Sequence, residues 1–222
     1  MAEVYTLGTA SWRCIGYAPH SPNGSVLPTF LNGAIHWSCD KSDSSDFIIA
    51  FDFDNEEFYV VPPPIHFGKK QKREIYRRPI GVLLGCLCLT DAPSYGDHLD
   101  IWVMKDYAVQ ESWTKEFVIP LYSGSLFHPI KYLTNGDILM VYAEQALVSY
   151  NYAKKRLRYL DIRGVDSKYE AIVHTPNLVS LKDIMMGDNL EVQNVRSRCA
   201  DSEEAVTPFL VECKPRGLRF VS

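Results

Sequence analysis

The stretch Phe30–Trp37, FLNGAIHW, places a tight-turn signal directly before a run of apolar residues. Asn-Gly is the strongest short signal for a β-hairpin, because both residues readily adopt the positive φ that such a turn requires. The same arrangement recurs at Leu84-Gly85, followed by CLCL, and at Asn135-Gly136, followed by DILMVY. The glycines lie 85 − 33 = 52 and 136 − 85 = 51 positions apart. The chain therefore contains an internal repeat of about fifty residues.

Two further strand-like segments follow each apolar run. The first of them is found at Phe47–Phe53, Leu99–Met104 and Ala146–Tyr152, where we align Phe51, Trp102 and Tyr150. The second is found at Glu57–Val61, Trp113–Ile119 and Leu157–Ile162. Apolar positions in these segments alternate or run continuously, and β-branched and aromatic residues dominate them. This pattern predicts strands and disfavours helices.

A leading strand, such as Val26–Leu31 or Ile130–Leu133, precedes each turn pair, so a unit consists of four antiparallel strands. We expect the leading strand to be outermost and the run after the glycine to be innermost. Four strands repeating near fifty residues are typical of a kelch-type β-propeller. The opening segment, Val4–Arg13, matches only the last two strands of a unit. The predicted fold is all-β, a propeller fragment of about three and a half four-stranded blades.

The repeat fades toward the C-terminus. Ala171–His174 and Asn177–Leu181 indicate one more strand pair, and no repeat is recognisable after Met186. The predicted organisation is therefore a partial propeller over residues 1–186 and a polar tail over 187–222. This tail contains one apolar patch, Phe209–Val211.

Composition excludes several classes of function. The net charge of −4 disfavours general nucleic-acid binding, and no apolar stretch approaches the length of a membrane span. No signal-peptide pattern is visible at Met1, which favours a cytoplasmic or nuclear protein with reduced cysteines. Cys86 and Cys88 share one strand face but have no second ligand pair, so we expect buried apolar thiols. No metal or cofactor is expected.

A set of short motifs resembles the F-box-associated domain of plant F-box and S-locus F-box-like proteins. The resemblance covers about residues 3–182. It rests on VYTLGT at 4–9 with SWR at 11–13, FLNGAIHW at 30–37, IAFDF at 49–53, GCLCL at 85–89, IWVMKDY at 101–107 and SWTK at 112–115.

The resemblance implies a protein-binding module. In that family an F-box binds the Skp adaptor of an SCF-type ubiquitin ligase, and the associated domain captures the protein to be ubiquitinated. The present sequence contains no F-box and no early blades, so we expect a module truncated at its N-terminus. A Skp/cullin partner is expected only if the full-length protein carries an F-box.

Two alternatives remain at this stage. A propeller enzyme would gather titratable groups on its innermost strands, where we expect only His36 and Asp137; this disfavours catalysis. No nucleophile elbow, phosphate-binding loop or dinucleotide motif is present either. The other alternative is a nonfunctional fragment of an F-box protein.

The connection lengths predict where a partner binds. The long connections 40–46, 62–78, 91–98 and 122–129 leave the end of the blades opposite to most of the short turns. Long loops on a rigid scaffold carry recognition more often than tight turns do. The candidate protein-binding residues are Arg73, Tyr76, Arg77, Tyr95, His98, Tyr122 and His128, with Tyr76, Arg77 and Tyr95 as the expected anchors.

Two other features have simpler interpretations. The basic run Lys69–Arg73 with Arg77 and Arg78 is read as a solvated loop in preference to a nuclear-import, nucleic-acid or docking segment. The four tryptophans, Trp12, Trp37, Trp102 and Trp113, fall at strand positions. We expect all four to fill the space between neighbouring blades.

Overall fold

The computed structural model describes residues 2–6, 11–19, 28–39, 48–65, 79–92, 97–120, 127–143 and 146–160, with the backbone of 212–214 and 217–221. Strands and turns make up these ranges, apart from one turn of 3-10 helix, η3 (Gln110–Ser112). None of the described segments forms a helix of the length and hydropathy needed to span a membrane. The chain divides into two compact units, Pro19–Val173 and Met1–Ala18 with His174–Ser222.

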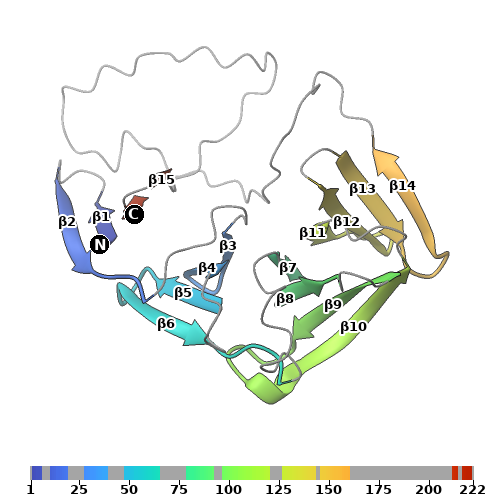
Figure 1. Ribbon diagram of the computed structural model, residues 1–222, viewed down its shortest axis with the longest axis horizontal. Coiled ribbons are helices and arrows are strands. Elements are labelled where there is room, and N and C mark those ends of the chain that lie inside the picture. Colours follow the sequence, from blue (N-terminus) through green and yellow to red (C-terminus); the bar gives the residue numbers. More distant parts are fainter. Residues whose placement is uncertain are drawn as a thin grey trace, which may run out of the picture. The chain divides into compact units, whose positions relative to one another are not determined.

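Three four-stranded sheets form the unit Pro19–Val173, and in each the strands follow chain order as an antiparallel meander (Figure 1). Sheet I contains β3 (Thr29–Leu31), β4 (Ala34–Ser38), β5 (Ile48–Asp52) and β6 (Glu57–Val61). Sheet II contains β7 (Ile80–Leu83), β8 (Cys86–Asp91), β9 (His98–Met104) and β10 (Trp113–Pro120). Sheet III contains β11 (Phe127–Tyr132), β12 (Asp137–Tyr142), β13 (Ala146–Asn151) and β14 (Arg156–Leu160). The predicted all-β class and the four-stranded antiparallel units are confirmed.

The leading strands β3, β7 and β11 lie at the inner edges of their sheets, where β7 packs beside both of the others (Figure 1). The Thr29 hydroxyl donates to the Ile80 carbonyl at 2.9 Å, and the Thr90 hydroxyl donates to the Phe127 carbonyl at 3.0 Å. The last strand of sheet III, β14, is the most exposed strand of that sheet. The expectation that the leading strand is outermost was therefore wrong. Alternation along a strand reports which face is buried, and it does not report which edge of the sheet faces inward.

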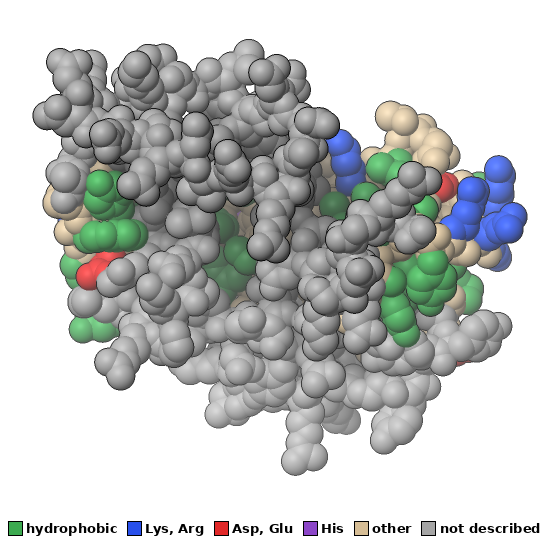
Figure 2. All heavy atoms as spheres, turned by 90° about the horizontal axis from the view of Figure 1, so that it is seen from above, with side chains coloured by type: hydrophobic (Ala, Val, Ile, Leu, Met, Phe, Trp, Pro, Cys, Tyr) green, Lys and Arg blue, Asp and Glu red, His purple; other side chains and the backbone are tan. Residues whose placement is uncertain are grey.

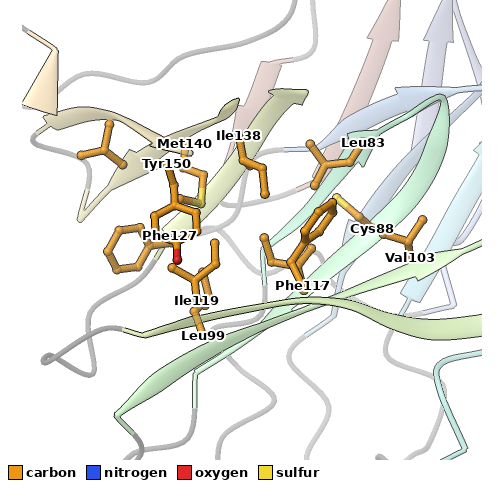
Figure 3. Close-up of a cluster of buried hydrophobic side chains, with 12 residues drawn as sticks. Leu83, Cys88, Leu99, Val103, Phe117, Ile119, Phe127, Ile138, Met140 and Tyr150 are labelled. Carbon is orange, nitrogen blue, oxygen red and sulfur yellow. The ribbon is translucent and has the colours of Figure 1, made fainter. Parts of the chain in front are cut away.

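Sheet II is buried on both faces. Leu99, Ile101 and Val103 of β9 belong to the core shared with sheet III, and Met104 belongs to the core shared with sheet I. Figure 3 shows the first of these cores, in which side chains of sheets II and III meet. Burial on two faces explains why the apolar runs of sheet II are nearly continuous in the sequence.

The tryptophans do not share one role. Trp37 and Trp113 are buried, and the Trp113 indole N–H donates to the Pro62 carbonyl at 2.8 Å. Trp102 is partly buried against the core between sheets I and II. Trp12 is 42% exposed, so its expected place in a core was wrong.

The alignment of Trp102 with Phe51 and Tyr150 was also wrong. Phe51 and Tyr150 pair with Ile35 and Ile138, each two residues after its turn glycine. Cys88 pairs with Val103, which places Met104 at the equivalent position of sheet II. Trp102 and Met104 lie two positions apart and therefore on the same face of β9.

The predicted turns form, with one difference among them. Asn32-Gly33 and Leu84-Gly85 are two-residue turns in which all four residues have positive φ. At the third turn only Gly136 has positive φ, and its N–H donates to the Leu133 carbonyl at 3.0 Å. The third reversal therefore starts at Leu133, ahead of the Asn-Gly pair.

A separate four-stranded sheet belongs to the other unit. Its strand order is β15 (Glu212–Lys214), β16 (Gly217–Val221), β1 (Ala2–Tyr5) and β2 (Trp12–Gly16), with β16 parallel to β1. β1 and β2 take the last two positions, as the repeat predicts. The expected strand pair at 171–181, the boundary at residue 186 and the apolar patch 209–211 lie outside the described residues.

Gly81 marks the closest approach of β7 to β11. A Cβ atom at this position would lie 2.5 Å from the Pro129 carbonyl oxygen and 3.0 Å from Pro129 Cγ. We expect Gly81→Ala to lower the free energy of unfolding by about 1–3 kcal/mol, because a backbone oxygen cannot move aside cheaply. Urea denaturation measures the change.

Gly85→Asn is the control for this prediction. Gly85 has positive φ and open space around its Cα, and Asn tolerates that conformation. Its effect should stay within about 0.5 kcal/mol. Equal losses for the two variants would show that β7 and β11 are not in close contact.

A partly buried chain of hydrogen bonds crosses from sheet I to the β9–β10 connection. His36 Nδ1 lies 3.2 Å from the Thr29 carbonyl, which can only accept, so Nδ1 carries the proton. His36 Nε2 then accepts from the Tyr107 hydroxyl at 2.6 Å, and Tyr107 accepts from Tyr59 at 2.5 Å. Burial lowers the pKa of His36 from 6.5 to about 4. The network therefore requires a neutral imidazole.

Acid should weaken this contact between the sheets. Between pH 6.5 and 4 the unfolded chain binds a proton at His36 that the folded chain excludes, so stability falls as the pH falls. We expect a loss of about 2 kcal/mol from this residue between pH 7 and about pH 5. Urea midpoints at both pH values, for the native chain and for His36→Gln, measure it. An unchanged pH dependence in His36→Gln would contradict the assignment.

Candidate functional site

One end of sheets I to III is closed by tight turns, here called the turn end. In the β5–β6 turn, Asp52 Oδ1 accepts from the backbone N–H groups of Asp54 and Asn55 at 2.8 and 3.0 Å. In the β13–β14 turn, Asn151 Oδ1 accepts from the Lys154 N–H at 2.8 Å. The β9–β10 connection is longer than the other turns. Within it, the Ser112 hydroxyl donates to the Asp106 carbonyl at 2.8 Å.

The opposite end, here called the loop end, carries the longer connections. Ser38, Ile48 and Val61 pair across sheet I at this end, and His98 pairs with Pro120 across sheet II. The strand ends that lie here are joined by the segments 39–47, 62–79, 92–97 and 121–126, and only 143–145 is short. The structure therefore agrees with the predicted difference between the two ends.

The predicted binding residues divide into two groups. One group lies outside the described residues, and the roles of its members stay predictions. It comprises Arg73, Tyr76, Arg77, Tyr95, Tyr122 and the basic run 69–73.

His98 and His128 were expected in loops, and the structure places both in strands. His98 is the first residue of β9, and His128 is the second residue of β11. Burial lowers the pKa of His128 to about 4. Strand β11 includes Pro129, although proline is rare inside strands. β11 accommodates it beside an irregularity in its pairing with β12.

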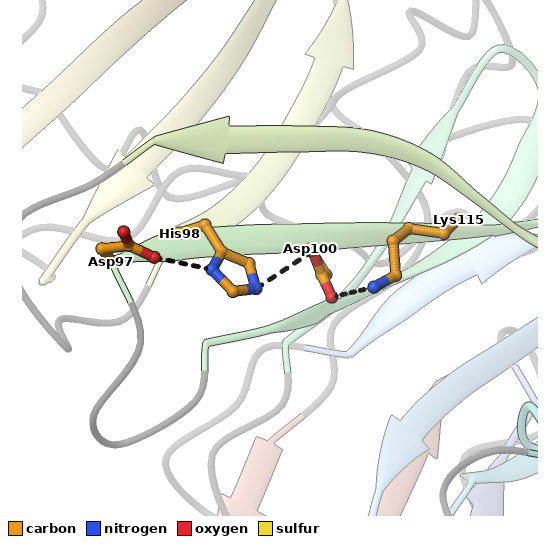
Figure 4. Close-up of polar contacts among 4 residues, drawn as sticks. All are labelled: Asp97, His98, Asp100 and Lys115. Atoms are coloured by element: carbon orange, nitrogen blue, oxygen red, sulfur yellow. Dashed lines mark hydrogen bonds and ion pairs between the residues drawn. The ribbon is translucent and has the colours of Figure 1, made fainter.

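His98 belongs to a polar cluster at the loop end of sheet II, shown in Figure 4. Its Nδ1 atom lies 3.0 Å from Asp97 Oδ1, and its Nε2 atom lies 3.6 Å from Asp100 Oδ1. Asp100 Oδ2 forms an ion pair with Lys115 Nζ at 2.6 Å. The Lys115 ammonium also lies 5.3 Å from the centroid of the Trp102 ring. Strand spacing of two residues places His98 and Asp100 on one face of β9.

The Asp100 carboxylate combines burial with an open acceptor. Its side chain is only 8% exposed, yet among the described residues Oδ1 has no hydrogen-bond partner. The 3.6 Å to His98 Nε2 exceeds hydrogen-bond range. The hydrogen bond from His98 lowers the pKa of Asp97 below its usual range. The cluster therefore contains a buried acceptor that is unsatisfied among the described residues, and this oxygen has almost no contact with solvent.

Sequence analysis did not single out Asp100 or Lys115. A signal was present, because Asp100 interrupts the apolar run of β9, HLDIWVM. A carboxylate inside a buried strand needs a partner, and that requirement points to a cation on a neighbouring strand.

The two titratable residues expected on innermost strands lie on second strands, β4 and β12. Asp137 is buried and accepts from Ser149 Oγ at 2.6 Å and from Asn151 Nδ2 at 2.5 Å. These two bonds lower the pKa of Asp137. His36 joins sheet I to the β9–β10 connection, as described above. Both side chains hold structural contacts.

Comparison with known protein families identifies a match to this chain. The family model described as the F-box associated beta propeller domain matches residues 1–181. The chain belongs to this family. The matched residues contain sheets I to III together with β1 and β2 of the F-box-associated domain.

Three relatives from Arabidopsis thaliana illustrate the similarity. F-box protein At3g07870 is 30% identical over 76% of this chain and 44% of its own length. F-box/kelch-repeat protein At3g23880 is 28% identical over 82% of this chain and 49% of its own length. F-box protein CPR1 is 28% identical over 74% of this chain and 40% of its own length. This F-box-associated domain thus spans less than half the length of these relatives.

The Asp100–Lys115 pair should stabilise the loop end of sheet II. Lys115→Met leaves a buried carboxylate without its cation, so we expect a loss of about 1–2 kcal/mol, moderated by the partial exposure of Lys115. The free energy of unfolding from urea denaturation tests this. Adding Asp100→Asn removes the unpaired charge and should restore part of the loss.

Lys105→Met provides a matched control. Lys105 pairs with Glu116 at 2.7 Å, but both partners of this pair are partly exposed. Its loss should stay within about 1 kcal/mol. If the two lysine variants lost equal stability, the burial of Asp100 would have no energetic consequence.

Proposed function

We propose that this F-box-associated domain is the substrate-recognition module of an SCF-type ubiquitin ligase receptor in the cytoplasm or nucleus. It binds a protein substrate at the loop end and has no catalytic chemistry of its own. The observation that carries the proposal is the difference between the two ends of the sheets. Tight turns close one end, whereas the longer connections and the polar cluster around Asp100 occupy the other.

The rigid part of the domain suits this role. Sheet II packs on both faces, so the strand ends that anchor the long connections are held in place by two cores. Recognition residues on loops need such a scaffold. Tyr76, Arg77 and Tyr95 remain the proposed anchors, because Tyr and Arg are the residues most often found as interface hot spots.

The open acceptor on Asp100 adds a chemical requirement to the partner. A donor that reaches Oδ1 would complete the hydrogen bonding of a buried carboxylate beside Lys115. Hydrogen bonds to charged groups contribute about 1.5–3 kcal/mol each. Because Oδ1 is buried, a donor reaches it only if binding displaces neighbouring side chains. For such a partner, we propose a lysine, arginine or hydroxyl side chain at this point.

Attachment to the ligase is a separate part of the proposal. The resemblance assigns adaptor binding to an F-box, and the curated relatives are named F-box proteins. We propose that these 222 residues take no direct part in binding the Skp adaptor. Calorimetry with the purified adaptor tests this, and micromolar binding by this chain would refute it.

Replacing the long connections should abolish substrate capture. The immobilised chain captures proteins from plant extract, and variants carry a Gly/Ser linker of equal length in place of 40–46, 66–78, 93–96 or 121–126. We expect at least one replacement to remove a partner that the native chain retains. Calorimetry with that partner, purified, then measures direct binding.

The control variants alter the turn end only. Asn32→Asp and Asn55→Ser change turn residues that are compatible with the same backbone. Both should retain the partner. If all four loop variants still captured the partner and the two turn variants lost it, the binding surface would lie at the turn end, and the proposal would be wrong. Circular dichroism confirms that every variant is folded.

A further inference from the structure

The β13–β14 hairpin carries an unusual concentration of positive charge. Lys154, Lys155, Arg156 and Arg158 are all exposed, and none of them forms an ion pair among the described residues. The four cations lie within five consecutive positions. Figure 2 shows a group of Lys and Arg side chains on the surface at the right of the view, the side on which β14 lies in Figure 1. We call these four residues the basic edge.

The equivalent hairpin of sheet I shows that folding does not require these charges. Both hairpins have four-residue loops, closed by Asp52 opposite Glu57 and by Asn151 opposite Arg156. The last loop residue has positive φ in each, 54° at Glu56 and 49° at Lys155. The same backbone therefore carries acidic residues in one sheet and basic residues in the other.

The basic edge also differs from its neighbour in sheet II. There the lysines are partnered, because Lys115 pairs with Asp100 and Lys105 pairs with Glu116. Edge strands use charged side chains, lysine especially, to prevent unwanted pairing. Since sheet I uses acidic residues at the same position, protection of the edge does not explain why this one is positive.

Arg156 and Arg158 lie on β14, whereas Lys154 and Lys155 lie in the turn that precedes it. β14 can accept another strand. β14 is the last strand of sheet III, and among the described residues it pairs only with β13. In an antiparallel edge strand every second residue directs its N–H and C=O groups away from the sheet. Tyr159 is 65% exposed on this strand, and its ring packs edge-on against Tyr142 at 6.2 Å between centroids. β14 thus offers main-chain groups, cations and an aromatic ring along one line.

We propose that the β14 edge binds an extended acidic segment of the protein substrate as an added β-strand, a second contact that rests on the proposed substrate-binding function. The main chain of the segment pairs with β14, and its carboxylates face the four cations. Strand addition is a recurring way for proteins to bind peptides. An acidic peptide fits better than a nucleic acid, because only a peptide uses the free main-chain groups.

The test uses a short fluorescein-labelled peptide in which Glu and Thr alternate, with binding to the full chain followed by fluorescence anisotropy. The variant replaces Lys154, Lys155, Arg156 and Arg158 with Glu. We expect an affinity loss of about tenfold to one hundredfold, as the loss of four exposed charge pairs implies. A peptide N-methylated at alternate residues should bind at least about tenfold more weakly, because it cannot pair with β14.

Three controls test whether the charge and position of the four cations cause the loss of affinity. Replacing the four cations with Gln avoids charge repulsion and should still weaken binding, while circular dichroism confirms the fold. Glu56→Lys with Glu57→Lys alters the matched hairpin of sheet I and should leave affinity unchanged. A peptide of alternating Lys and Thr should not bind.

The possible outcomes separate this proposal from the proposed function. If the Glu-Thr peptide does not bind, or binds equally well when N-methylated, strand addition at β14 is wrong. Tighter binding of single-stranded oligothymidine than of the peptide would also overturn it. Neither result affects partner capture by the loop variants, which tests the loop end. If the peptide binds but none of the loop variants loses a partner, substrate binding at the loop end is wrong. Peptide binding at the basic edge would still stand.

Discussion

The burial of sheet II on both faces is the constraint on which the other features of the unit Pro19–Val173 depend. One face packs against sheet I and the other against sheet III, so β9 must be apolar at successive positions. The contact also demands a residue without a side chain at Gly81, where β7 meets Pro129 of β11. Polar links reinforce the packing through Thr29, Thr90 and the His36–Tyr107–Tyr59 chain.

The two ends of sheets I to III differ in their hydrogen bonding. At the turn end, side chains such as Asp52 and Asn151 accept hydrogen bonds from backbone N–H groups and hold the turns in place. At the loop end, the strands finish beside a buried carboxylate whose second oxygen has no hydrogen-bond partner among the described residues. The same sheet therefore supplies both the rigidity and the unsatisfied chemistry that recognition requires.

Charge separates the two proposed contact surfaces. The loop end of sheet II contains Asp97, Asp100 and Lys115, whereas the β13–β14 hairpin presents four exposed cations that form no ion pair within the described part of the chain. A substrate that used both would present donors to the loop end and an acidic strand to β14. Such a division would give specificity from opposite charges, because a partner of uniform charge would be disfavoured at one of the surfaces.

The sequence by itself determined the repeat, the strands, the turns and the long connections, because these follow from local signals such as Asn-Gly pairs and two-residue alternation. Of the candidate site, it indicated the end of the sheets and His98, but not Asp100 or Lys115, which meet only when β9 and β10 pair. Tertiary structure alone decided that the leading strands are innermost, that Met104 and not Trp102 matches Phe51, and that β16 pairs with β1. Each of these depends on contacts between residues distant in the chain. Alternation with a period of two specifies which face of a strand is buried, but it specifies neither the neighbouring strands nor the pairing register.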